Sequence, residues 1–160
     1  MRYRIRDYKP EDFDRLHTLD QECFPPGIAY SRRELAYYIK RPHAFTLVAE
    51  EKNKAIAGFI VASSHPKKMG HIITIDTDRK LRRSGLGTLL MNAAETRLRE
   101  IGCEVVFLEV AVNNTPAIKF YKKLGYSILK TLMGYYQGKL DGFLMIRRFS
   151  EEQGVTGITK

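Results

Sequence analysis

A basic turn that contains two glycines is the segment of this sequence whose residue types most directly indicate chemistry. It precedes Thr88, links a predicted strand to the most regular predicted helix, and reads Arg82-Arg83-Ser84-Gly85-Leu86-Gly87. The first N–H groups of a helix have no partner within the helix, and the helix dipole adds partial positive charge there. Glycines allow phosphate oxygens to approach the backbone, and arginine side chains bind phosphate well. The segment therefore predicts an anion site.

An ordinary glycine turn before a helix with a solvated basic face would give the same pattern. The segment also differs from the two best-known phosphate loops. No Lys-Ser/Thr pair follows Gly87, as a P-loop requires, and the third glycine of the dinucleotide-binding fingerprint is missing. By itself, the turn indicates an anion but does not say which one.

Hydrophobic periodicity places this turn inside a single α/β domain of residues 1–149. The predicted strands are residues 3–8, 44–51, 55–64, 71–76, 105–112, 126–133 and 142–148, and the predicted helices are residues 10–24, 31–40, 86–101 and 114–124. Strand–helix–strand units in the second half imply a partly parallel sheet, whereas the meander in the first half implies antiparallel pairing. We therefore expect a mixed central sheet with helices on both faces. Residues 150–160 show no periodicity and are predicted to form a frayed tail.

Length, charge and composition narrow the function classes. A chain of 160 residues suits one domain with one core. The formal net charge of +9 favours a polyanionic partner, whether nucleic acid, ribosome or a phosphorylated cofactor. No stretch is apolar enough for a membrane span or a signal peptide, so we expect a cytoplasmic protein. The two cysteines and four histidines lack the spacing of a disulfide framework or a metal site, so no metal is expected.

Three motifs, in this order along the chain, resemble the GNAT N-acetyltransferase superfamily. The turn Arg82-x-x-Gly85-x-Gly87 is similar to its acetyl-CoA-binding motif. The next strand, loop and helix of the superfamily are similar to Leu108-Glu109-Val110-x-x-x-Asn114-x-x-Ala117-x-x-x-Tyr121-x-x-Leu124-Gly125-Tyr126. The branch that acetylates protein N-termini, including the ribosomal-protein-alanine N-acetyltransferases, ends in a segment similar to Tyr135-Tyr136-x-Gly138-x-x-Asp141-Gly142-x-x-Met145. The resemblance covers residues 1 to about 149.

The resemblance implies a GNAT-like twisted sheet with a splay between two neighbouring parallel strands, residues 72–77 and 105–112. Acetyl-CoA would lie in that splay, with its pantetheine arm paired to the backbone of Ile75 and Thr77 and its pyrophosphate on the N–H groups from Arg82 to Thr88. The cofactor-binding residues that the resemblance implies are Ile75, Asp76, Thr77, Arg82, Arg83, Ser84, Gly85, Leu86, Gly87, Thr88, Asn114, Ala117 and Tyr121.

Acetyl transfer to an amine requires a neutral amine, a donor for the acetyl oxygen and a proton donor for the departing thiolate. The resemblance implies the backbone of Ile75 as the oxygen donor and Tyr121 as the general acid. A core aromatic on the helix face is the alternative for Tyr121. Glu109 lies in an otherwise apolar strand, where a carboxylate is costly to bury unless it is paired. The resemblance implies that Glu109 is the general base, directly or through water. The alternatives are an outward-pointing carboxylate or one that orders substrate hydrogen bonds.

Two segments would flank the entrance for the acceptor. With Glu109, the residues predicted to bind the substrate are Phe24, Pro25 and Tyr30, between the first two helices, and Tyr135 and Tyr136, before the last strand. Packing of loop aromatics is the alternative. Ala111, Gly142 and the long loop from residue 24 to residue 30 depart from the pattern of the N-terminal branch. The acceptor is therefore the least determined part of the prediction.

The favoured hypothesis is an acetyl-CoA-dependent N-acetyltransferase that acts on the α-amino group of a protein or peptide N-terminus, with a ribosomal protein as one candidate. A GNAT enzyme that acts on lysine or a small-molecule amine is the first alternative, and a CoA-binding domain without catalysis is another. A basic nucleic-acid- or ribosome-binding module is the non-enzyme alternative. It is disfavoured because the sequence shows no recognition helix and no row of stacking aromatics. The acceptor sequence, the choice between monomer and dimer, and the physiological role stay open.

Overall fold

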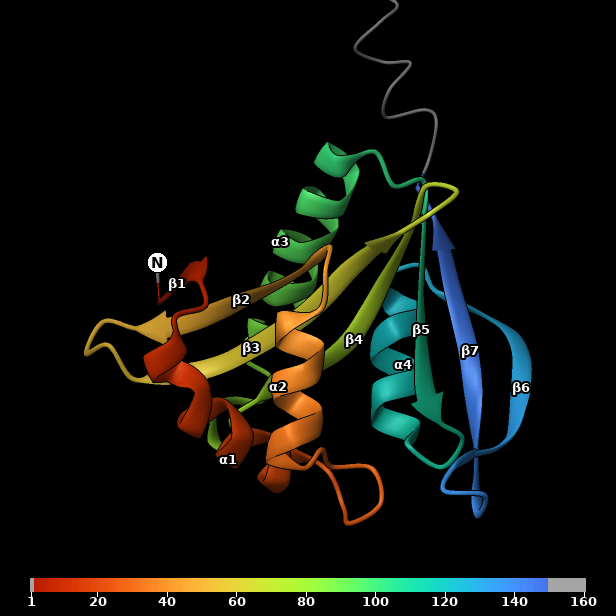
Figure 1. Ribbon diagram of the computed structural model, residues 1–160, viewed down its shortest axis with the longest axis horizontal. Helices are drawn as coiled ribbons and strands as arrows, with labels where there is room; N and C mark the ends of the chain where they lie inside the picture. The colour runs from red at the N-terminus through yellow and green to blue at the C-terminus, as the bar shows by residue number, and fades with distance from the viewer. Residues whose placement is uncertain (1, 150–160) are drawn as a thin grey trace, which may run out of the picture.

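The structure is a computed structural model that describes residues 2–149. One seven-stranded sheet runs through the molecule in the order β1-β2-β3-β4-β5-β7-β6 (Figure 1). The strands are β1 (Tyr3–Asp7), β2 (Ala44–Glu51), β3 (Ile56–His65), β4 (Met69–Thr77), β5 (Val105–Ala111), β6 (Ser127–Tyr136) and β7 (Leu140–Arg148). β4 and β5 are parallel, and every other neighbouring pair is antiparallel. This confirms the predicted mixed sheet, whereas the predicted tail of residues 150–160 lies outside the described part of the chain.

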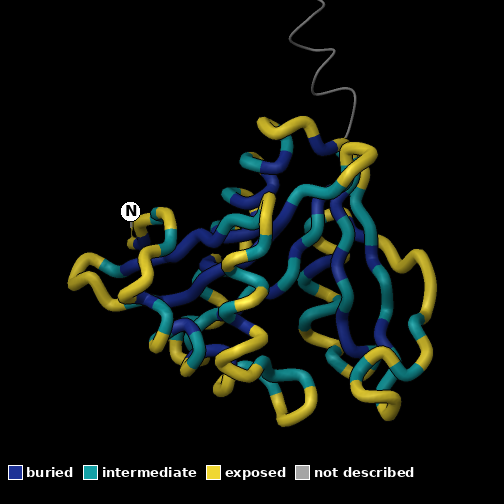
Figure 2. The backbone as a smooth tube through the Cα atoms, in the orientation of Figure 1, coloured by how far each residue is buried: buried dark blue, intermediate teal, exposed yellow. Residues whose placement is uncertain are grey.

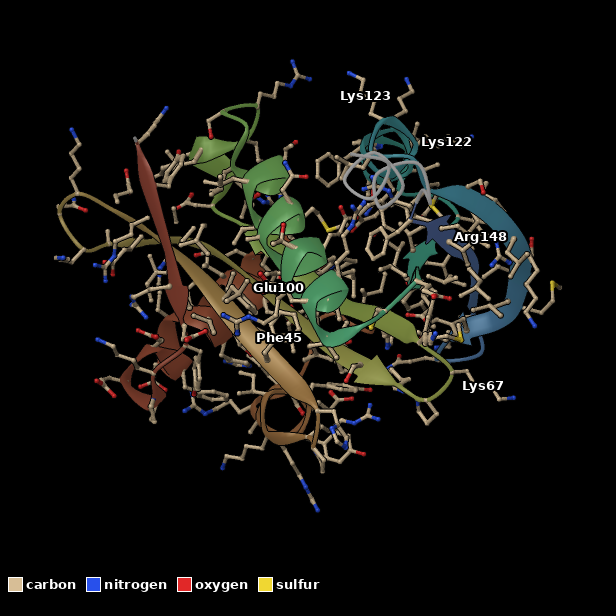
Figure 3. All side chains as sticks on the ribbon, turned by 90° about the horizontal axis from the view of Figure 1, so that it is seen from above. Phe45, Lys67, Glu100, Lys122, Lys123 and Arg148 are labelled. Carbon is tan, nitrogen blue, oxygen red and sulfur yellow. The ribbon has the colours of Figure 1, made fainter. Side chains whose placement is uncertain are left out.

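Helices cover both faces of the sheet. The smaller core joins α1 (Phe13–Cys23) and α2 (Arg32–Lys40) to one face, with Leu16, Leu35 and Phe59 at its centre. The larger core joins α3 (Leu86–Ile101) and α4 (Thr115–Lys123) to the other face. Figure 2 shows that the buried residues follow the central strands. From above, α3 crosses the sheet diagonally, and Lys122 and Lys123 extend outward from α4 (Figure 3).

Local signals set the helix ends where the sequence predicts them. Ser31 caps α2 in a reciprocal capping box, because its Oγ accepts from Glu34 N at 3.1 Å while Glu34 Oε1 accepts from Ser31 N at 2.9 Å. α3 ends at Gly102, whose φ of 112° lies in the left-handed region that favours glycine. Asn114 caps α4 through Ala117 N at 3.3 Å. Short 3₁₀ turns precede α1 and α3, at Pro10–Asp12 and Arg79–Leu81.

The last two strands are longer than predicted. Tyr136 pairs with Leu140, so β6 and β7 are joined by a short turn of residues 137–139. The register shifts between Leu132 and Tyr136, which places a bulge where Gly134 suggested a loop. Tyr135 and Tyr136 therefore lie on a strand, and not in a loop before the last strand as the sequence suggested.

An ion-pair network around Arg6 ties β1 to β2 and to the start of α1. Its guanidinium donates to Asp12 Oδ2 at 2.8 Å, to Asp12 Oδ1 at 3.0 Å and to Glu50 Oε2 at 2.8 Å. These hydrogen bonds hold the pKa values of the Asp12 and Glu50 carboxyls below their usual range. Because both folded-state pKa values are lowered, the network stabilises the fold above the ordinary carboxyl pKa, and this contribution is lost as the pH falls through the lowered values.

Replacement of Arg6 by methionine should lower the free energy of unfolding by about 3 kcal/mol at neutral pH, because the buried Asp12 carboxylate loses its charged partner. Urea unfolding at several pH values would measure this, and the difference from wild type should shrink below about pH 4 as the carboxyls take up protons. The control is Arg32→Met, which removes the exposed ion pair with Asp14 and should cost less than about 0.5 kcal/mol. Equal losses for the two variants would contradict the assignment.

Candidate active site

β4 and β5 separate soon after they meet. Their parallel pairing covers only Met69–His71 and Val105–Phe107, although β4 continues to Thr77 and β5 to Ala111. In Figure 1 the two strands run together at the top and diverge below. On the other edge of β4 the register with β3 shifts, so that Ile73 has no partner strand residue. This bulge bends β4 away from β5 and gives the splay that the resemblance implied.

Beyond His71, the edge of β4 that faces this splay is not paired with another strand within residues 2–149. Asp78 N donates to Ala57 O at 2.8 Å, so Asp78 directs its backbone toward β3. Because N–H and C=O groups alternate in direction along an antiparallel pair, Asp76 does the same, whereas Ile75 and Thr77 point away from β3. Thr77 O accepts a hydrogen bond from Cys23 Sγ at 3.3 Å, which agrees with this direction. Ile75 and Thr77 can therefore pair with an extended ligand between the strands.

The glycine turn lies at the end of β4, where it opens α3. Arg83 and Gly85 adopt φ values of 66° and 84°, and a backbone that turns in this way directs successive N–H groups into a concave anion site. A Cβ added to Gly85 would meet nothing within 4 Å, so the glycine keeps this side of the turn open. Ser84 contributes only its backbone, because its Oγ donates to Leu81 O at 2.5 Å and lies 3.1 Å from Tyr3 Oη. The side chain of Leu86 is buried in the core, and Arg82 lies close to Cys23 and Asp76.

α4 packs against the first turn of α3. A Cβ on Gly87 would lie 3.1 Å from the ring of Phe120, so Gly87 permits this close approach. Tyr121, the next residue of α4, is buried and packs edge-on against Tyr126, with 6.0 Å between the ring centroids. Burial, together with the nearby Asp76 carboxyl, raises the pKa of Tyr121 above its usual value. The phenol therefore stays protonated at neutral pH, as a proton donor must.

Glu109 has a partner that the sequence did not indicate. His71 Nε2 lies 2.8 Å from Glu109 Oε1, and each side chain is 15% exposed. The His71 ring stacks on Phe107, with 4.3 Å between the ring centroids and an interplanar angle of 9°. In the sequence, the four histidines show no metal-ligand spacing, and no local pattern around His71 indicates a carboxylate partner. The pairing of β4 with β5 explains the contact. His71 on β4 is in register with Phe107 on β5, and Glu109 lies two residues after Phe107, on the same face of β5.

Tyrosines surround Glu109 on the acceptor side. Burial raises the pKa of Tyr30 and Tyr136, and that of Tyr135 to about 12, and the Glu109 charge adds to each shift. Tyr135 and Tyr136 pack edge-on at 4.9 Å between centroids. The loop between α1 and α2 approaches the turn after β6, since a Cβ on Gly27 would lie 3.1 Å from Gln137 Oε1.

The structure brings together most of the predicted site residues but leaves three at its margin. Phe24 is half-buried at the end of α1, and Pro25 is exposed beside it. Asp76 does not line the splay, because its backbone faces β3 and its side chain is buried on the α1 face. Within residues 2–149 no group of three His, Cys, Asp or Glu side chains could hold a metal ion. Nor is any helix in that range long and apolar enough to cross a membrane.

Comparison with known proteins identifies the architecture. The family described as "Acetyltransferase (GNAT) family" matches residues 13–126. An N-alpha-acetyltransferase of Sulfurisphaera tokodaii is 32% identical over 154 residues, with 89% of this chain and 91% of the relative covered. The N-terminal acetyltransferase B complex catalytic subunit NAA20 of Arabidopsis thaliana is 34% identical over 119 residues, which cover 72% of this chain and 68% of the relative. The crystal structure of Ard1 from Thermoplasma volcanium superposes with a TM-score of 0.84 at 27% identity and covers 94% of this chain and 100% of that one.

This fold, with its splayed parallel strand pair and its glycine turn at a helix start, is that of an acyl-group transferase family. The chain belongs to the acetyltransferase (GNAT) family and is an enzyme of that family. Enzymes of this family use acetyl-CoA as the acetyl donor.

Proposed function

We propose that this enzyme transfers the acetyl group of acetyl-CoA to the α-amino group of a protein or peptide N-terminus. The observation that carries the proposal is the position of the His71–Glu109 pair. It faces the tyrosines at the acceptor side of the β4–β5 splay, while Tyr121 packs in the core on the other face. The N-alpha-acetyltransferases among the relatives support the same acceptor class.

The residues at the splay fit acetyl-CoA. Backbone groups of Ile75 and Thr77 would bind the pantetheine amides, and the N–H groups from Arg82 to Thr88 would bind the pyrophosphate. When bound, acetyl-CoA supplies a thioester whose carbonyl is the electrophile. The N–H of Ile75 would stabilise the negative charge that develops on the acetyl oxygen. The observations behind this fit are the free backbone of β4 and the open side of Gly85.

The chain's own groups can move the two protons that the reaction requires. Glu109, held by His71, would accept a proton from the acceptor ammonium, directly or through water, so that the amine becomes nucleophilic. As the new C–N bond forms and the C–S bond breaks, Tyr121 would donate its proton to the departing sulfur. Its raised pKa keeps that proton in place until it is needed. The nitrogen of the new C–N bond would give up its second proton, which restores the Tyr121 phenol through solvent. Glu109 would release the first proton to solvent, so each acceptor ammonium that is acetylated frees one proton overall.

A peptide panel tests the proposal. Purified protein would be given acetyl-CoA with peptides that carry a free N-terminus, the same peptides with a blocked N-terminus and one internal lysine, and small amines. Thiol release and peptide mass would be measured together. We expect turnover with free N-termini and modification of the first residue only. Turnover confined to lysine side chains or small amines would overturn the N-terminal assignment and support the alternative acceptor class.

A further inference from the structure

Two buried aspartates meet beneath the acceptor loop, outside the groups that perform the transfer. Asp20 lies on α1 and Asp76 on β4, and their carboxyl groups lie close enough for a hydrogen bond between them. Asp20 is 0% exposed and Asp76 is 1% exposed. Two carboxylates in contact without solvent cannot both carry charge at low cost. The pair must therefore hold a proton over much of the pH range.

The hydrogen-bond partners of the four carboxyl oxygens place that proton between the two side chains. Asp20 Oδ2 accepts from Tyr30 N at 2.6 Å, and Asp76 Oδ1 accepts from Thr74 Oγ1 at 2.7 Å. Asp20 Oδ1 and Asp76 Oδ2 have no N–H or O–H donor among residues 2–149. One shared proton satisfies both oxygens. Burial and the charge of Asp20 raise the pKa of Asp76 well above its usual range, so Asp76 is the donor and Asp20 the acceptor.

Other charged and titratable groups surround the pair on several elements. His17 and Glu34 act on Asp20 from α1 and α2. Arg82 acts on Asp76 from the glycine turn, and the Cys23 thiol and the Tyr121 phenol lie within its electrostatic reach. The Arg82 charge lowers the pKa of Asp76, but burial and the Asp20 charge, which raise it, are the larger effects.

The pair fixes Tyr30. The N–H of Tyr30 donates to Asp20, and its carbonyl accepts from Gln21 Nε2 at 2.6 Å, so the last turn of α1 holds both backbone polar groups of this residue. The Tyr30 ring packs against Tyr38 with 5.0 Å between centroids and lies in the electrostatic range of Glu109. The shared proton thus joins β4, through Asp20, to an aromatic wall of the acceptor site.

We propose that Asp20 and Asp76 are a positioning pair whose single shared proton holds Tyr30 and the loop of residues 24–30 in the acceptor-binding conformation. The inference rests on the proposed function of that site. Loss of the proton as the pH rises places two like charges between α1 and β4, so the loop should move and acceptor binding should weaken. The backbone of Asp76 points toward β3, whereas the backbone groups of Ile75 and Thr77 that would bind acetyl-CoA point the other way, so acetyl-CoA binding should be spared.

Two substitutions of Asp76 distinguish the effect of its titratable proton from the effect of its hydrogen bond to Asp20. Asp76→Asn keeps a donor to Asp20 but has no titratable proton, whereas Asp76→Ala removes the donor. For Asp76→Ala we expect the acceptor KM to rise about tenfold, with the KM for acetyl-CoA changed less than about twofold. Asp76→Asn should keep near wild-type KM values at neutral pH. As the pH rises above neutral, kcat/KM for the acceptor should fall in wild type relative to Asp76→Asn, so the ratio of the variant value to the wild-type value should increase. Ionisation of the acceptor amine affects both enzymes equally and therefore cancels in this ratio.

Two readouts do not depend on the acceptor being correct. The infrared difference spectrum between wild type and Asp76→Asn should show the C=O stretch of a protonated carboxylic acid, which disappears at high pH. Hydrogen exchange of the Tyr30 amide should accelerate in Asp76→Ala and not in Asp76→Asn. If the acid band is absent, or if Tyr30 exchanges at the wild-type rate in Asp76→Ala, the positioning pair is wrong. If both appear but no N-terminus is acetylated, only the proposed function fails.

Discussion

Replacement of Glu109 by glutamine should lower kcat by about 100-fold or more, because the amide keeps the shape of the side chain but cannot accept the proton of the acceptor ammonium. The KM for acetyl-CoA should change less than about twofold, since Glu109 lies on the acceptor side of the splay. The His71 contact can persist, because the glutamine oxygen can still accept from Nε2–H at the position of Oε1. Steady-state kinetics with a free-N-terminus peptide would measure the effect.

The matched control for Glu109→Gln is Glu104→Gln. Glu104 lies just before β5 and makes an exposed ion pair with Lys68, at 3.4 Å between Nζ and Oε2. Its loss should leave kcat and both KM values close to wild type. A variant His71→Gln should lower kcat by less than Glu109→Gln, because it removes the group that orients the base and not the base. If Glu109→Gln retained most of the activity while His71→Gln abolished it, the histidine would be the base.

Replacement of Tyr121 by phenylalanine should lower kcat by about 100-fold while acetyl-CoA binding changes little, because only the hydroxyl that we propose as the proton donor to the departing sulfur is lost. The raised pKa of Tyr121 adds a pH expectation. Its proton is retained well above neutral pH, so the wild-type enzyme should show no alkaline loss of kcat from this acid. Measurement of kcat against pH, with acetyl-CoA affinity determined separately by titration calorimetry, tests both statements.

A second buried tyrosine provides the comparison for Tyr121→Phe. Tyr126 Oη donates to Glu95 Oε2 at 2.6 Å, and Arg147 Nη1 donates to Glu95 Oε1 at 2.6 Å, so this hydroxyl belongs to a structural network. Tyr126→Phe should lower the free energy of unfolding by about 1 kcal/mol but leave kcat within a few-fold of wild type. A parallel fall of acetyl-CoA affinity and turnover in Tyr121→Phe would show that Tyr121 serves packing and not proton transfer.

Local chemistry let the sequence determine most of the elements. Ser31 with Glu34 fixes the start of α2, the periodic leucines fix α3, and Gly102 ends it, because capping and amphipathic burial act within a few residues of the chain. The glycine turn could be placed before α3 for the same reason, and its role as an anion site stays a prediction. The splay followed only from the resemblance, since no single segment encodes the separation of two strands.

The tertiary structure alone decided which side chains meet. The bulge at Ile73 shifts the register of β4, so Ile75 pairs with Ile60 over the larger core while Asp76 pairs with Phe59 over the smaller one. A shift of one residue exchanges the two faces of a strand, and nothing in the local alternation of residues 71–76 signals it. The same long-range register brings His71 to Glu109, and Asp76 to Asp20. The sequence by itself therefore determined the glycine turn and the helices around it, whereas the partners of Glu109 and Asp76 depended on strand pairing between distant segments.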